Sequence, residues 1–119
     1  MEKIVITGGL GYIGTKLCNL YSKESSKKNI LVVDNRFLPD RVKQLKKWGI
    51  HFVEGDILNR PLIQGIIKDS DIIYHLAGIT DVAYTHTESD PLKDELINKV
   101  AIEGSKNIID NMPNKAKIV

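Results

Sequence analysis

The sequence predicts an α/β fold built on a doubly wound parallel sheet. Short runs of β-branched residues alternate with helical patterns through all 119 residues. Each run is apolar throughout rather than alternately polar, which is typical of strands buried on both faces. Right-handed crossovers between successive strands would give the order 3-2-1-4, with a fifth strand beginning beside the fourth.

The individual elements follow from local patterns. Strand-like runs occupy residues 3–7, 29–33, 50–54, 71–75 and 115–119. Amphipathic spacing predicts helices over residues 12–23 and 40–48, and Asn59 is a suitable N-cap for a third helix. Asp90 and Pro91 begin a longer helix, whose apolar stripe is Leu92, Leu96, Val100, Gly104 and Ile108, with Ile97 and Ala101 alongside. The last strand stops as soon as it begins, so we expect an incomplete domain.

Composition excludes several classes of protein. The 17 basic and 15 acidic residues leave a net charge of only +2 and are scattered, so we expect no nucleic-acid partner. Apolar runs are far too short to span a bilayer, and no secretory signal follows Met1. Cys18 is the single cysteine, which excludes a disulfide framework and favours a cytoplasmic protein. The length is sufficient for one domain, residues 1–119.

A glycine-rich segment between the first strand and the first helix carries the strongest functional signal. Gly8 suits a tight turn, Gly11 allows backbone N–H groups to approach a pyrophosphate, and Gly14 allows close helix–sheet packing. Tyr12 and Ile13 begin the helix, whose free N–H groups and positive dipole end stabilise phosphate. This arrangement predicts a dinucleotide-binding site of the Rossmann type.

An acidic residue stands at the spacing that such a site requires. Asp34 ends the second strand, 20 residues after Gly14, where a carboxylate accepts hydrogen bonds from the adenosine ribose. A carboxylate would repel a 2′-phosphate, so the sequence favours NAD over NADP. Arg36, two residues further on, weakens that preference.

Four segments resemble the extended short-chain dehydrogenase/reductase family in the family's own order. Thr7 to Gly14 is similar to its T-G-G-x-G-Y-I-G fingerprint, and Val33-Asp34-Asn35 to the V-D-N ending its second strand. Glu54-Gly-Asp-Ile57 resembles its G-D-[IL], and His75-Leu-Ala-Gly78 its H-[LF]-A-[AG]. The resemblance covers essentially the whole chain.

The resemblance implies a role for each matching residue. Asp34 and Asn35 would hold the adenosine ribose, and Asp56 and Ile57 would flank the adenine. The backbone at Leu76, Ala77 and Gly78 would pass the phosphates and the nicotinamide ribose, while Val82 and Thr85 would lie near the substrate.

The implied parent is an NAD-dependent nucleotide-sugar epimerase or dehydratase, closest to UDP-sugar 4-epimerases, that forms a homodimer. Its general base or acid would be the tyrosine of a Tyr-x-x-x-Lys pair, in which the lysine lowers the pKa of the tyrosine and holds the nicotinamide ribose. Tyr12 and Lys16 match that spacing, but they stand in the phosphate loop, so we reject them. We therefore predict no catalytic residue before Val119, and a chain that is inactive alone.

Several residues keep alternative interpretations. In the family, an asparagine on the long helix approaches the cofactor. Its position corresponds to Ala101 when counted back from Gly104, and to Asn98 when counted forward from Pro91. The three histidines, His51, His75 and His86, are too widely spaced for a metal site, and His75 is expected to be structural. Cys18 and Trp48 are expected in the core. A non-catalytic NAD(P)(H)-binding regulatory module remains the alternative function.

Overall fold

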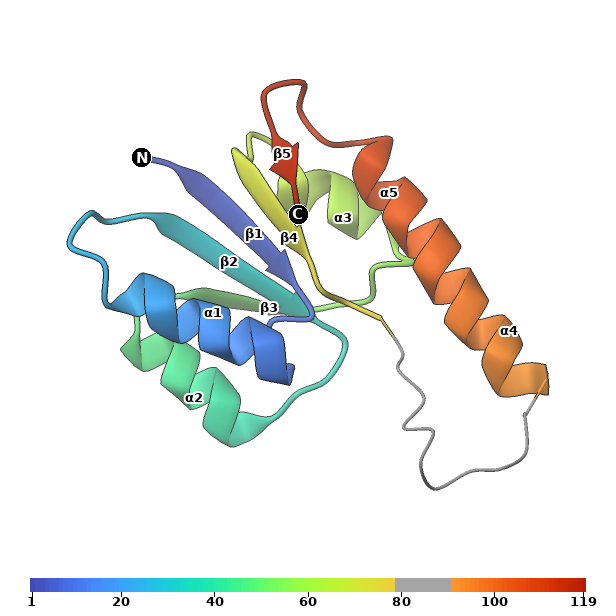
Figure 1. Cartoon of the computed structure of the whole chain (residues 1–119), viewed down its shortest axis with the longest axis horizontal. Coiled ribbons are helices and arrows are strands. Elements are labelled where there is room, and N and C mark those ends of the chain that lie inside the picture. Colours follow the sequence, from blue (N-terminus) through green and yellow to red (C-terminus); the bar gives the residue numbers. More distant parts are fainter. Residues whose placement is uncertain (79–90) are drawn as a thin grey trace.

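The computed structural model describes residues 1–78 and 91–119, and its centre is a five-stranded parallel sheet (Figure 1). The strands are β1 (Lys3–Thr7), β2 (Asn29–Asp34), β3 (His51–Glu54), β4 (Ile72–His75) and β5 (Lys117–Ile118). Their order is β3-β2-β1-β4-β5, and every neighbouring pair is parallel. The predicted fold class and strand order are confirmed.

The helices connect successive strands. They are α1 (Tyr12–Ser22), α2 (Pro39–Lys47), α3 (Arg60–Ile67), α4 (Pro91–Lys99) and α5 (Ser105–Ile109). Asn59 is the N-cap of α3, where its side chain accepts a hydrogen bond from the Leu62 N–H at 3.3 Å. The predicted cap at Asp90 lies outside the described residues.

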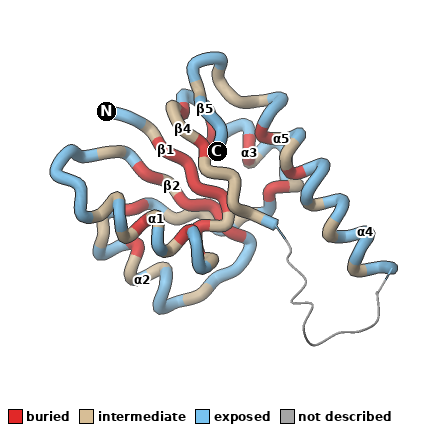
Figure 2. Tube along the Cα trace, viewed as in Figure 1, coloured by how far each residue is buried: buried red, intermediate tan, exposed pale blue. Residues whose placement is uncertain are grey.

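Helices cover both faces of the sheet, with α1 and α2 on one face and α3 and α5 on the other (Figure 1). Side chains of β1 alternate between two apolar cores, because successive residues of a strand point to opposite faces. Ile4 and Ile6 pack with Cys18 of α1 and Leu45 of α2, whereas Val5 packs toward α3 and α5. Figure 2 shows the buried residues concentrated along β1 and β2.

Cys18 and Trp48 take the positions expected of them. Cys18 is fully buried in the core between the sheet and α1, and burial raises the pKa of its thiol to about 11. Trp48 is half-buried against the same core. Within the described part of the chain, no helix is long and apolar enough to cross a bilayer.

The long helix predicted after residue 90 is divided. A π-helical turn, η1 (Val100–Gly104), separates α4 from α5, and only its end and α5 contribute buried residues, Gly104 and Ile108. Leu92 is 78% exposed and Leu96 is 47% exposed, and α4 is mostly exposed in Figure 2. A four-residue apolar spacing drifts around an α-helix of 3.6 residues per turn, and the wider π turn compensates for that drift.

Candidate nucleotide-binding site

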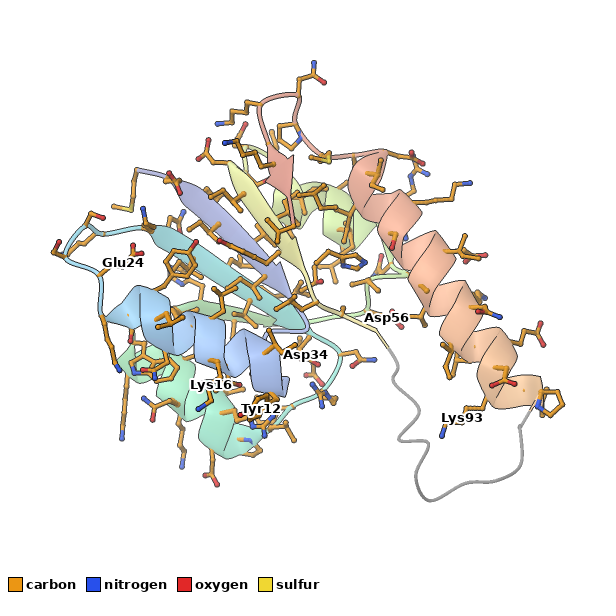
Figure 3. All side chains as sticks on the ribbon, viewed as in Figure 1. Tyr12, Lys16, Glu24, Asp34, Asp56 and Lys93 are labelled. Carbon is orange, nitrogen blue, oxygen red and sulfur yellow. The ribbon has the colours of Figure 1, made fainter. Side chains whose placement is uncertain are left out.

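A cleft of about 770 Å³ lies where the strands end and the loops from β1, β2, β3 and β4 meet. Open parallel sheets place their ligand sites at this edge. The structure brings together along the cleft all the residues predicted to bind the cofactor: Gly8, Gly11, Tyr12, Ile13, Asp34, Asn35, Asp56, Ile57, Leu76, Ala77 and Gly78. Asp34, Asp56 and Tyr12 are labelled in Figure 3, where they converge on this edge. Their contacts with a cofactor stay a prediction.

The glycine loop is packed too tightly for side chains. Gly8 has a φ of 67°, which favours glycine, and a Cβ there would lie 2.7 Å from the Ala77 nitrogen. A Cβ on Gly14 would lie 2.5 Å from the Gly9 Cα. The loop therefore lies directly against both the start of α1 and the segment after β4, and its shape depends on these glycines.

The N-terminus of α1 is open to a ligand. Gly11 is its N-cap, no side chain caps the helix, and its first turn holds no acidic residue. An α-helix leaves its first N–H groups without intrahelical partners and carries partial positive charge at that end. Tyr12 is 77% exposed and Ile13 is 66% exposed, so both stand on the rim of the cleft. This end of the cleft suits an anionic group.

Tyr12 and Lys16 contact each other on the first turns of α1 (Figure 3). The Lys16 Nζ lies 5.7 Å from the centroid of the Tyr12 ring, a cation–π distance. Lys16 does not line the cleft. The pair therefore belongs to the entrance of the phosphate loop.

Asp34 is the most heavily bonded carboxylate of the cleft. Its side chain is 3% exposed, and Oδ2 accepts hydrogen bonds from the Leu10 N–H at 3.1 Å and from Arg36 Nη2 at 3.2 Å. Oδ1 accepts from the Arg36 backbone N–H at 3.0 Å and from Arg36 Nε at 3.1 Å. The carboxylate thus joins the glycine loop to the end of β2. Burial and this bonding fix its orientation.

The Asp56–Ile57 segment is supported by α5. Asp56 Oδ1 accepts a hydrogen bond from the Leu58 N–H at 2.9 Å, and the Ile57 carbonyl accepts one from Asn107 Nδ2 at 2.9 Å. A Cβ on Gly104 would lie 2.4 Å from Ile57 Cδ1. The π turn and α5 therefore set the position of the loop after β3. Sequence reasoning missed Asn107, although its position just after Gly104 and Ser105 was the available signal.

His75 joins three elements behind the cleft. Thr7 Oγ1 accepts a hydrogen bond from the Ala77 N–H at 3.1 Å and lies 2.8 Å from His75 Nδ1. The other ring nitrogen, Nε2, lies 3.1 Å from Ser105 Oγ, so both nitrogens of the imidazole have a hydroxyl partner. Burial lowers the pKa of His75, because desolvation disfavours the charged imidazolium. The imidazole itself, as well as the backbone, has a structural role.

Other sequence expectations have mixed outcomes. Neither Asn98 nor Ala101 lines the cleft; Leu96 and Val100 do so from the same helix, and neither was predicted to be a site residue. Val82, Thr85 and His86 lie outside the described residues. Among residues 1–78 and 91–119, no three His, Cys, Asp or Glu side chains gather as a metal site.

The fold and this cleft together define a nucleotide-binding protein of the Rossmann type. The sequence profile of the 3-beta hydroxysteroid dehydrogenase/isomerase family matches residues 5–118, so the chain belongs to that family. The resemblance to NAD-dependent epimerases and dehydratases is confirmed by its curated relatives and structural neighbours.

The chain is 31% identical over 117 residues to UDP-glucose 4-epimerase of Mycoplasma genitalium, covering 97% of this chain and 33% of that protein. It is 33% identical over 95 residues to dTDP-D-glucose 4,6-dehydratase of Dictyostelium discoideum, covering 75% of this chain and 21% of that protein. The crystal structure of UDP-glucose 4-epimerase from Brucella ovis in complex with NAD superposes with a TM-score of 0.72 and 20% sequence identity. The match covers 93% of this chain and 32% of that protein. The chain therefore spans a third or less of the length of these proteins.

Proposed function

We propose that the cleft binds NAD, and that residues 1–119 form the NAD-binding domain of a nucleotide-sugar epimerase or dehydratase. The observation that carries this proposal is the buried Asp34 carboxylate, bonded to the Leu10 N–H of the glycine loop beside the open N-terminus of α1. A ribose next to a pyrophosphate needs that combination of an acceptor and a positive helix end. The glycine loop, which no Cβ can enter at Gly8 or Gly14, fits the close approach of a phosphate.

Each part of the cleft has a role in this proposal. Gly8, Gly11, Tyr12 and Ile13 receive the pyrophosphate at the start of α1. Asp34 and Asn35 bind the adenosine ribose, Asp56 and Ile57 flank the adenine, and Leu76, Ala77 and Gly78 border the phosphates and the nicotinamide ribose. Bound NAD supplies a hydride acceptor that can return the hydride to the substrate. The described residues bind and orient the cofactor.

The names of the relatives support a nucleotide sugar as the substrate of the parent enzyme. A sugar hydroxyl would lose its proton to a general base while its carbon gives a hydride to NAD, and the parent would be closest to a UDP-sugar 4-epimerase. We further propose a cytoplasmic homodimer with no nucleic-acid or membrane partner. The low net charge and the single cysteine support the location and the absence of nucleic acid.

A charge added at the phosphate end tests NAD binding. Ile13→Glu places a carboxylate in the first turn of α1, where it favours the helix but repels a pyrophosphate. We expect isothermal titration calorimetry to show at least about a tenfold loss of NAD affinity in this variant. Leu20→Glu is the matched control, because Leu20 lies on the same helix at a similar exposure, 65% against 66%. Equal NAD affinity in Ile13→Glu and wild type, or no NAD binding by the wild type, contradicts the proposal.

A second candidate is a module that binds NAD(P)(H) and regulates a partner without catalysis. It is favoured by the position of the Tyr-x-x-x-Lys pair found in the described residues: Tyr12 lines the phosphate end of the cleft, and Lys16 lies beside Tyr12 outside the cleft. Both candidates predict no turnover by residues 1–119 in an assay with UDP-glucose or UDP-galactose and NAD. Turnover by the 119-residue chain would refute both the regulatory module and the expectation that this chain is inactive alone.

A further inference from the structure

We infer that Arg36 sets the cofactor preference of the cleft, so that the site accepts NADP as well as NAD. The inference rests on the proposed dinucleotide site and concerns the group attached to the adenosine ribose. A buried carboxylate at the end of β2 would, alone, select NAD by repelling a 2′-phosphate. Here that carboxylate is paired with an arginine that also lines the cleft.

The hydrogen-bonding capacity of Asp34 is already filled. A carboxylate has about four lone-pair sites, and Asp34 accepts four hydrogen bonds. Two come from backbone N–H groups, of Leu10 and Arg36, and two from the Arg36 guanidinium. A ribose hydroxyl can bind Asp34 only after the guanidinium withdraws. Cofactor binding and the position of the Arg36 side chain are therefore coupled.

The guanidinium is the partner that can move. The Arg36 side chain is 51% exposed, whereas the Asp34 side chain is 3% exposed. The exposed guanidinium can swing away, and the hydroxyls of an incoming ribose then replace the hydrogen bonds that the buried carboxylate loses. The two backbone N–H groups stay in place and continue to orient Asp34. The ribose then replaces the guanidinium without loosening the loop.

A displaced guanidinium remains beside the ribose. In the structure Arg36 Nη2 lies 3.7 Å from the position of a Cβ on Gly11, so the guanidinium bridges the space between Asp34 and the phosphate loop. A guanidinium binds phosphate through paired, charge-assisted hydrogen bonds. Arg36 thus offsets the negative charge of Asp34 and supplies the donors that a 2′-phosphate requires. Asp56, the other carboxylate of the cleft, is engaged by the Leu58 N–H on the adenine side.

Calorimetric titration of the whole chain with NAD and with NADP tests this inference. We expect the wild type to bind both with affinities within about tenfold of each other. Arg36→Met should lower the affinity for NADP by about tenfold or more and leave the affinity for NAD unchanged or higher, because the competing guanidinium is gone. Arg36→Lys keeps the cation but loses the paired donors, so it should retain only part of the NADP binding. Lys46→Met removes one positive charge on α2 outside the cleft and should change neither affinity.

The outcomes separate this inference from the proposed function. The role of Arg36 is overturned if the wild type binds NADP more than about a hundredfold more weakly than NAD and Arg36→Met leaves the ratio of the two affinities unchanged. In that case the proposal of NAD binding still stands. Failure of the wild type to bind either dinucleotide overturns both. Circular dichroism of each variant shows that it is folded, and the Arg36→Lys comparison separates a charge effect from a loss of packing.

Discussion

Thr7 and His75 face each other at the carboxyl ends of β1 and β4, and Thr7 Oγ1 lies 2.8 Å from His75 Nδ1. The same hydroxyl accepts the Ala77 N–H, and His75 Nε2 reaches Ser105 on α5. Through these contacts the His75 side chain connects the strand before the phosphate loop, the segment after β4, and helix α5 on one face of the sheet.

The first prediction concerns the pH dependence of stability. The pKa of His75 lies below its ordinary value of 6.5 because burial disfavours the imidazolium. The unfolded chain therefore binds more protons than the native one as the pH falls below about 6.5, and the free energy of unfolding decreases there. Urea unfolding at about pH 7.5 and about pH 5.5 should show this decrease, at most about 1.4 kcal/mol per pH unit for one group.

Two glutamine variants assign that decrease to one histidine. His75→Gln should unfold with a flatter pH dependence, because the titrating imidazole is gone. His51→Gln, at an exposed position on β3, should keep the slope of the wild type. A His75→Gln variant with the full wild-type slope would show that another group is responsible.

A second prediction compares two glycines that both lie within α-helices. Gly14→Ala places a Cβ 2.5 Å from the Gly9 Cα, so backbone atoms must shift, and we expect a loss of about 1–3 kcal/mol of stability. Gly65→Ala in α3 meets nothing within 4 Å and should gain up to about 1 kcal/mol from helix propensity. Urea midpoints measure both. Equal effects of the two substitutions would contradict the tight packing of the glycine loop.

The third prediction concerns a pair of tyrosines between α1 and β4. The hydroxyls of Tyr21 and Tyr74 lie 2.7 Å apart, and desolvation, followed by the hydrogen bond to Tyr74, raises the pKa of Tyr21. Replacing either tyrosine by phenylalanine should cost about 1 kcal/mol, because the remaining hydroxyl loses its partner. The double variant should cost less than the sum of the two. Additive losses in the double-mutant cycle would show that the hydroxyls do not interact.

The fourth prediction uses Cys18 as a probe of the core. A thiol with a pKa of about 11 is almost entirely protonated at neutral pH, and thiolate is the reactive form. With a disulfide reagent at about pH 8, native Cys18 should react on the order of 100-fold more slowly than the thiol of the urea-unfolded chain. Rapid labelling of the native protein would show that α1 opens readily from the sheet.

The strand order could be predicted because the signals were local. Each strand is an apolar run, and the handedness of the crossovers leaves few arrangements. The glycine loop and Asp34 were likewise visible, since a dinucleotide site fixes both their residue types and their spacing. The residues predicted for the cofactor accordingly lie along a single cleft.

The remaining features depend on contacts that spacing does not specify. The saturation of Asp34 requires the rotamer of Arg36, and the Asn107 bond to Ile57 joins residues from α5 and the loop after β3. The π turn was signalled by the four-residue apolar spacing from Leu92 to Ile108, but a straight helix is the commoner result of such a pattern.

The order of the strands also governs how this chain must fold. Every strand pairing joins distant parts of the sequence, as in Ile4 with Ile72 or Leu31 with His51. None of the described strand pairs is a hairpin that could form early and serve as a template, because parallel neighbours need a crossover between them. The chain must close long loops before its central strand gains either partner, and that entropy cost precedes any stabilising contact. Among domains of similar size, high contact order of this kind is associated with slow folding.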